Sequence, residues 1–321
     1  AAERGILPVT YSTNASAGFC LTTYTQLYHG LRPVVLGFGQ FANEWQGTME
    51  KNARILRWQD IITFKIQETS KFVKSFARFG GQNASQSYIL FHDGGDVVFL
   101  RNSSFFSERA RKSRSHVMFA AEKKFWVGLP GSAEDRMLSF LEHMFPKLEQ
   151  GVAEQGSRYL NAGAYLGRVD GLLDMYASVA APLKRIFKFA KHVINSNDFN
   201  DQALSSLYYV SSLKEFGGND RIDIDRNSSL FQCMHDRAEG KDFAINEDGD
   251  FVNLHTTERP GLLHFNGLHD VRKIHQYVRR LLPHEPTTIG NLSVHLWHSH
   301  DGFHKVPFKV LCPSFELAKE G

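Results

Sequence analysis

Short apolar segments alternate with helical stretches through the first 122 residues, and this alternation limits the possible folds more than any other feature. Helical spacing of apolar residues is found over 18–29 and 67–79. Apolar strands are expected on either side of these stretches, over 6–13, 33–39, 87–93 and 116–122. Such alternation predicts an α/β sheet, and ligands of such sheets bind at the carboxyl ends of the strands.

The second half of the chain is less regular. A strand is expected over Tyr159–Gly167, where small residues indicate that another group approaches closely. Further helices are expected over 134–148 and 271–282, and another from residue 169 that is interrupted at Pro182. Further strands are expected over 221–226, 251–256 and 261–267. The chain contains no repeat and no clear linker, so we expect one domain over 1–270, with 271–321 as a C-terminal extension packed on it.

Charge and composition exclude several classes of protein. The net charge is +3 and the densest basic cluster is RARKSRS, Arg109–Ser115, which we interpret as a solvated loop rather than a nucleic-acid site. No apolar run is long enough to span a membrane, and no P-loop or GxSxG motif is present. The three cysteines permit one disulfide, but their positions in the sequence do not determine which two pair.

Glycosylation motifs bear on the compartment. N-x-S sequons occur at five asparagines, where chance would give roughly two: Asn14, Asn83, Asn102, Asn227 and Asn291. This excess favours the secretory-pathway lumen, in the endoplasmic reticulum or Golgi, or secretion.

The segment ILFHDGGDVVFL has the most informative local pattern. A buried strand ends at Asp93, two glycines follow, and Asp96 precedes a second apolar run. Both carboxylates can reach one point beyond the sheet, where hard cations such as Mn²⁺ or Mg²⁺ take oxygen ligands and share a nucleotide's phosphates. The alternative is a β-turn whose aspartates bond to backbone donors.

A second strand end carries a histidine. In GLLHFNG, His264 is followed by Asn266 and Gly267. A lone histidine here would be structural, but together with Asp93 and Asp96 it makes a carboxylate–carboxylate–imidazole set that favours Mn²⁺ over Mg²⁺. The glycine turn would let backbone amides approach a phosphate.

Acidic residues also cluster in NSNDFNDQAL. Asp198 and Asp201 lie where a helix is expected to begin. Either carboxylate could cap that helix, or contact sugar hydroxyls or an acceptor near the metal.

The ordered set of motifs resembles the glycosyltransferase domain of the procollagen lysyl hydroxylases, a family related to the collagen galactosyl- and glucosyltransferases. The resemblance covers about residues 8–270. Its pieces, in chain order, are VTYST, NEWQG, ILFHDGGDVVF, FAAEKKFW, RYLNAGAYLG, NDFNDQALSSLYY, IDIDRNSSLFQ and LLHFNG.

This resemblance implies a GT-A fold, with a Rossmann-like central mixed sheet flanked by helices, and a Mn²⁺-dependent hexosyltransferase. The enzyme would transfer glucose or galactose from a UDP-sugar to a hydroxyl on a protein or glycan, such as a collagen-like hydroxylysine, with retention of configuration. It implies metal ligands at Asp93, Asp96 and His264. It places a donor pocket at Thr13, Trp45, Gly95, Asn266 and Gly267, and catalytic-pocket residues at Trp126, Asn161, Asp198 and Asp201.

Three features depart from the family pattern. The family's run of aspartates before Asp-Gln is diluted here to Asp198-Phe199-Asn200-Asp201. Gly95 stands where the family has an aromatic residue, and the lysine expected shortly after HxNG is replaced by Leu268, His269 and Asp270. His269 is one candidate to replace that lysine. These departures support an alternative function, a catalytically weak UDP-sugar-binding domain with a structural or partner-binding role.

Overall fold

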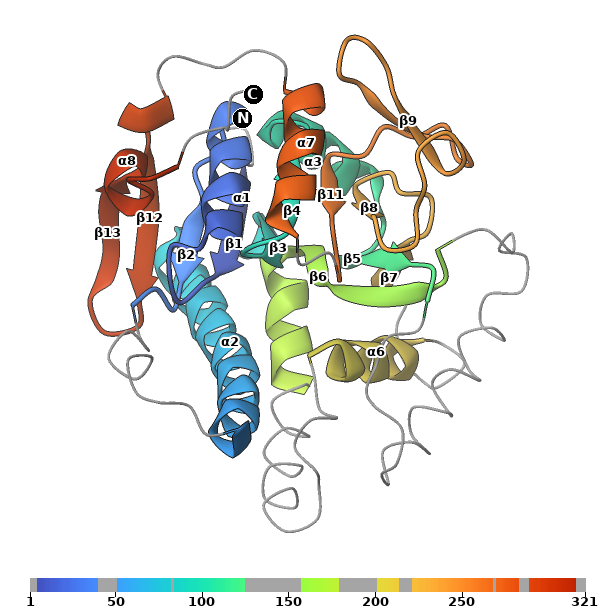
Figure 1. The fold of residues 1–321 in the computed structure, drawn as a ribbon. Coiled ribbons are helices and arrows are strands. Elements are labelled where there is room, and N and C mark those ends of the chain that lie inside the picture. Colours follow the sequence, from blue (N-terminus) through green and yellow to red (C-terminus); the bar gives the residue numbers. More distant parts are fainter. Residues whose placement is uncertain are drawn as a thin grey trace.

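The computed structural model of the chain describes residues 5–39, 51–81, 84–124, 157–178, 201–213, 221–267, 270–282 and 289–315. Figure 1 shows a central sheet with helices on both sides. The strands and helices expected in these ranges are found, with boundaries that differ by a few residues. The exception is the second helix, α2 (Lys51–Phe79), which begins well before the expected residue 67.

An eight-stranded mixed sheet forms the centre, in the order β13-β12-β2-β1-β3-β6-β5-β7. In chain order its strands are β1 (Ile6–Tyr11), β2 (Val34–Leu36), β3 (Tyr88–Asp93), β5 (Val117–Glu122), β6 (Tyr159–Arg168), β7 (Ile222–Asp225), β12 (Ser293–His298) and β13 (Gly302–Pro307). β6 and β13 are antiparallel to their neighbours, and the other pairs are parallel. The carboxyl ends of β1, β3 and β5 therefore meet the amino end of β6 at one edge.

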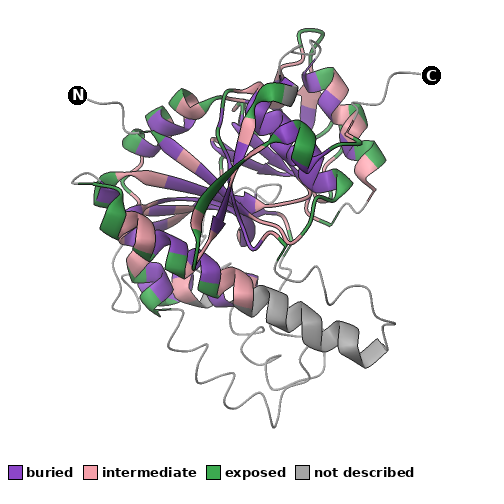
Figure 2. Ribbon diagram, turned by 90° about the vertical axis from the view of Figure 1, so that its left-hand side faces the viewer, coloured by how far each residue is buried: buried purple, intermediate pink, exposed green. Residues whose placement is uncertain are grey.

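Helices cover both faces of this sheet. One face packs against α2, a helical segment at 169–178 and α6 (Asp201–Ser212), through residues such as Phe72, Leu172 and Leu204. The other face packs against α1 (Ala17–Tyr28), α7 (Val271–Leu281) and α8 (Phe308–Leu311). Figure 2 shows the buried residues concentrated in the strands and on the inward sides of the helices. The 3₁₀ turn η1 (Ala84–Gln86) lies between α2 and β3.

Two smaller sheets complete the described fold. β4 (Val97–Phe99), β11 (Leu262–His264) and β8 (Phe231–Cys233) form a three-stranded sheet, and β9 (Phe243–Ile245) pairs with β10 (Phe251–Asn253).

The sequence analysis predicted that the basic cluster at 109–115 is a solvated loop. The structure shows that this prediction is only partly right. Its first four residues form the last turn of α3 (Ser103–Lys112). Asn102 caps this helix by accepting a hydrogen bond from Phe105 N at 3.3 Å, and Phe106 and Ala110, one turn apart, are buried. The buried apolar pair and the cap stabilise a helix here, although most residues of the segment are polar.

The C-terminal residues extend the central sheet. After α7 and η3 (Ile289–Asn291), β12 pairs with β2, and β13 forms the outer strand. A disulfide joins Cys312 to Cys20 on α1, and Cys233 is a buried free thiol. In the described part of the chain no helix is both long and apolar enough to cross a membrane.

Candidate metal centre

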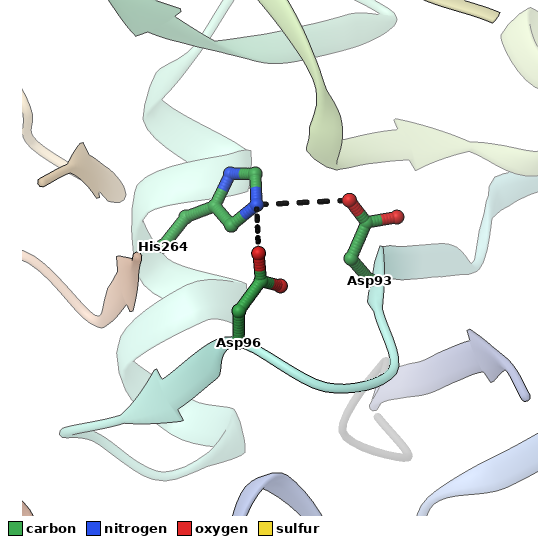
Figure 3. Close-up of side chains that lie close together, drawn as sticks. All are labelled: Asp93, Asp96 and His264. Carbon is green, nitrogen blue, oxygen red and sulfur yellow. Dashed lines mark ion pairs between the residues drawn. The ribbon is translucent and has the colours of Figure 1, made fainter. Parts of the chain in front are cut away.

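Three side chains from two sheets converge at the carboxyl edge of the central sheet (Figure 3). Asp93 ends β3, Asp96 precedes β4, and His264 ends β11. His264 Nε2 lies 3.6 Å from an oxygen of Asp93 and 3.4 Å from an oxygen of Asp96. The three potential ligand atoms lie within 4.8 Å of one another, so one cation could contact all of them.

Gly163 on β6 makes room for this cluster. A β-carbon at this position would lie 2.1 Å from His264 Cε1 and 2.7 Å from an Asp93 oxygen. The pairing of β5 with β6 shifts here, so that Phe119 pairs with Tyr165 and Ala120 with Asn161. Such an irregularity re-aims side chains beside a site. The close approach expected from the small residues of 159–167 is therefore found.

Asn161 sets the tautomer of the His264 ring. Its Oδ1 accepts hydrogen bonds from Gly163 N, at 2.9 Å, and from His264 Nδ1, at 3.0 Å, while its Nδ2 donates to Glu122. The backbone donor and the Glu122 carboxylate together fix the orientation of the amide. Nδ1 of His264 must then carry the hydrogen, which leaves the lone pair of Nε2 facing the two aspartates.

This arrangement calls for a positive charge between the three groups. His264 is 3% exposed, and its Nε2 has no hydrogen-bond partner. A lone pair directed at two carboxylates is repulsive unless a proton or a cation lies between them. Burial lowers the pKa of His264, but the attraction of Asp96 outweighs it and raises that pKa well above its usual value. A divalent cation would meet the same electrostatic demand with three ligands.

Glu122, at the carboxyl end of β5, joins three parts of the site. It accepts hydrogen bonds from Asn161 Nδ2 at 3.2 Å, Asn266 Nδ2 at 2.7 Å and Gln202 Nε2 at 2.5 Å. Burial raises the pKa of Glu122 to about 7, against the effect of these three donors. The sequence analysis did not single out Glu122, although its position at the end of an apolar strand is the same signal that identified Asp93.

Lys65 on α2 links two carboxylates of the site. Its Nζ lies 2.8 Å from Asp93 Oδ1 and 2.7 Å from Asp201 Oδ2. Asp201 is thus in the first turn of α6, with its side chain directed to Lys65 beside the metal centre. Nothing in the sequence pairs Lys65 with residues 28 and 136 positions away, so reasoning from the sequence missed it.

Helix α1 holds the loop between the two aspartates. A β-carbon on Gly18 would lie 2.1 Å from Gly95 O, so helix and loop are in backbone contact. The Thr22 hydroxyl donates to Val97 O at 2.8 Å, and Phe99 N donates to the Thr25 hydroxyl at 3.1 Å. These bonds satisfy the backbone of β4 on the side that no strand covers.

The remaining predicted residues divide into two groups. Thr13, Gly95, Asn266 and Gly267 lie in loops that follow β1, β3 and β11. Trp45, Trp126 and Asp198 lie outside the described residues, so their positions stay predictions.

Sequence comparison finds one curated relative. A procollagen-lysine,2-oxoglutarate 5-dioxygenase of Drosophila melanogaster is 21% identical over 266 residues, which are 82% of this chain and 30% of that protein. The chain thus spans about a third of the length of the curated relative it matches.

Solved structures of two glycosyltransferases also match. The galactosyltransferase LgtC, in complex with donor and acceptor sugar analogues, is 14% identical, with a TM-score of 0.41, over 87% of this chain and 97% of the other. Mouse xyloside xylosyltransferase 1, in its apo form, is 9% identical, with a TM-score of 0.43, over 82% and 97% of the two chains.

A family model described as the PLOD GT domain matches residues 2–286. PLOD denotes the procollagen-lysine 2-oxoglutarate 5-dioxygenases, the family that the sequence motifs resemble. Because the match covers most of the 321 residues, the chain belongs to the family of PLOD glycosyltransferase domains, and its fold is of the GT-A type.

Proposed function

We propose that this glycosyltransferase domain transfers a hexose, glucose or galactose, from a UDP-sugar to a hydroxyl on a protein or glycan, with Mn²⁺ and with retention of configuration. The observation that carries the proposal is the position of His264 Nε2, which is buried, has no hydrogen-bond partner and lies within 3.6 Å of oxygens of both Asp93 and Asp96. A cation at the donor diphosphate would neutralise its charge, and these three groups suit one.

The chemistry of the ligand set favours Mn²⁺. Two carboxylates suit hard cations generally, and one imidazole shifts the preference towards a transition metal. Asp93, Asp96 and His264 would hold the ion, which would neutralise the charge that develops on the departing diphosphate. Asn161 and Glu122 would keep the imidazole in the required tautomer.

A pocket beside the Asn266–Gly267 turn offers a place for the negative charge of the donor. Its lining includes His235, Lys273, Asn266 and Gly267. Lys273 lies on the first turn of α7, and its side chain has no ion pair among the described residues. Gly267 has φ 80°, a conformation that brings backbone close to a ligand without strain only in glycine. We assign Lys273 the role of the phosphate-neutralising lysine, in place of His269, which lies outside the described residues.

Asp201 would act at the sugar. It lines one cavity together with Asp93, Lys65 and Tyr11. Its carboxylate would accept hydrogen bonds from sugar hydroxyls and stabilise positive charge at the anomeric carbon as the diphosphate departs. Lys65 bridges Asp201 and Asp93, and would keep both carboxylates oriented. Retention can follow either front-face attack by the acceptor or a covalent intermediate on such a carboxylate.

The family and the disulfide support a proposal for the compartment and the acceptor. The Cys20–Cys312 bond is typical of oxidising compartments, and the Drosophila relative is named for a procollagen lysine. We therefore propose that the protein acts in the secretory pathway, with a hydroxyl of a protein or glycan, such as a collagen-like hydroxylysine, as acceptor.

Release of UDP from a panel of UDP-sugars tests the function. With Mn²⁺ present we expect hydrolysis or transfer with one preferred UDP-hexose, and little UDP release after the metal is removed by a chelator. Tight, Mn²⁺-dependent binding of UDP without release of UDP from any donor, with or without acceptor, would favour the alternative of a catalytically weak UDP-sugar-binding domain.

A further inference from the structure

The β12–β13 hairpin carries a pair of histidines that the transferase site does not use. His298 ends β12, and His304 lies on β13, diagonally across from it, since His298 pairs with Gly302 and Leu296 with His304. The ring centroids of His298 and His304 are 5.6 Å apart, at an interplanar angle of 61°. Diagonal residues on one face of an antiparallel pair are within reach of each other's side chains.

This separation suits a shared metal ion. Zinc binds imidazole nitrogen at about 2.0–2.1 Å, and the ring centre lies about 1.1 Å beyond the nitrogen, so two rings on a tetrahedral ion have centroids about 5.2 Å apart. The observed distance exceeds this by a few tenths of an ångström, which small side-chain rotations remove. Neither ring has a hydrogen bond or an ion pair in the described part of the chain, so their nitrogens remain available.

The hairpin is already rigid before any ion binds. Its strands pair over six positions, and Trp297, on the opposite face from the two histidines, is buried. Phe303, also on that opposite face, lies 6.2 Å from the ring of Phe72 on α2. A ligand pair held on such a framework loses little conformational entropy on binding.

The hairpin is also separate from the metal centre described above. In the sheet, β2 and β1 lie between β12 and β3, and Figure 1 shows the hairpin at the outer edge of the molecule. Both histidines lie beyond residue 286, where the match to the family ends. The family's function therefore does not account for them.

We propose that His298 and His304 form a second metal site, which binds a borderline transition-metal ion such as Zn²⁺ or Cu²⁺ through two imidazoles, with water completing the coordination. Imidazole ligands without a carboxylate favour these ions over Mn²⁺ and Mg²⁺. The two sites would then be distinguished by metal: an oxygen-rich site for Mn²⁺ and an imidazole pair for Zn²⁺.

Zinc titration of the full chain by isothermal calorimetry tests this site. Wild-type protein should bind one more Zn²⁺ than His304→Ala or His298→Ala, and loss of either imidazole should weaken that binding event about a hundredfold, as expected when a chelate becomes a single ligand. His295→Ala is the matched control, because His295 lies on the same strand but faces the opposite side. It should bind Zn²⁺ as the wild type does.

The fold and the transferase activity provide separate checks. These positions are partly or fully exposed, so all three variants should melt as the wild type does and keep Mn²⁺-dependent UDP release. Equal zinc stoichiometry and affinity in wild type, His298→Ala and His304→Ala would overturn the proposal. Equal loss in His295→Ala would do the same, because the binding would then be diffuse.

Discussion

Replacing Glu122 by glutamine tests whether the network behind His264 holds the metal centre together. The glutamine has nearly the same shape, but one of its two terminal atoms becomes an NH₂ group. That group must face a donor, because one carboxylate oxygen accepts from Gln202 and the other from Asn161 and Asn266. Gln202 cannot simply turn its amide round, since its Oε1 accepts a hydrogen bond from Ala162 N.

The stability of this variant should change little. At least one charge-assisted hydrogen bond is lost, which costs about 1.5–3 kcal/mol. Against this loss, the variant avoids burying a charge. Burial raises the pKa of Glu122 from 4.5 to about 7 in spite of three donors, which corresponds to about 3 kcal/mol against the ionised form at high pH. The two contributions nearly cancel, so the free energy of unfolding should stay within about 2 kcal/mol of wild type.

Metal binding should respond much more strongly. When Asn161 loses its anchor, it no longer fixes the tautomer of His264, and changes to such supporting hydrogen bonds weaken metal affinity about 10–100-fold. Calorimetric titration of Mn²⁺, with melting curves of the same samples, measures both quantities. Glu258→Gln is the matched control, because Glu258 forms a partly exposed ion pair with Arg109 at 2.9 Å, away from the metal centre.

The pH dependence adds a second test. Because the pKa of Glu122 is about 7, acidification from pH 8 to pH 6 protonates this carboxyl in the wild type and weakens Mn²⁺ binding. The glutamine variant lacks this contribution and should show a shallower decline. Wild-type Mn²⁺ affinity in Glu122→Gln, with wild-type pH dependence, would refute the reasoning, since Asn161 would then hold the ring without Glu122.

Four further predictions concern the rest of the site. Gly163→Ala should abolish Mn²⁺ binding, because the new methyl group would overlap His264. Gly95→Ala is the control and should bind Mn²⁺ normally, because no atom lies within 4 Å of a β-carbon added at Gly95. Equal calorimetric affinities of the two variants would contradict this prediction. Asp201→Ala should keep UDP and Mn²⁺ binding while turnover falls by orders of magnitude. Full turnover together with a free energy of unfolding lowered by about 1 kcal/mol would instead show that Asp201 only stabilises α6. Lys273→Ala should weaken UDP binding about tenfold and leave metal-only binding unchanged, and an unchanged UDP affinity would remove Lys273 from the donor site. Cys312→Ser should lower the free energy of unfolding by about 2–4 kcal/mol in chemical denaturation, and reducing agent should then have no further effect on the variant.

The parts of the site that the sequence revealed are those with a local signal. Asp93 and His264 each follow an apolar run, and a carboxylate or imidazole at a strand end can be recognised without knowledge of the partner strand. Lys65 has no such signal, because its role depends on how α2 lies across the sheet. Glu122 did have the signal, yet its importance arises from three donors on separate segments.

The fold shows the same division. The first six expected elements were found because hydrophobic periodicity is a local property. The place of β12 beside β2 depends on contacts between residues some 260 positions apart in the chain, and no local pattern specifies it. The pairing of Cys20 with Cys312 was open for the same reason.

The disulfide has a consequence for how the protein matures. Its two cysteines are 292 residues apart, and at about 5–20 residues per second a ribosome needs about 15–60 s to pass from one to the other. Throughout that interval Cys20 lacks its native partner, and once Cys233 has been synthesised it is available as an incorrect partner. β2 meanwhile lacks its neighbour β12 and exposes an unpaired edge. Correct oxidation must therefore follow the synthesis of Cys312, and the yield of folded protein should depend on how well thiol–disulfide exchange corrects any earlier pairing.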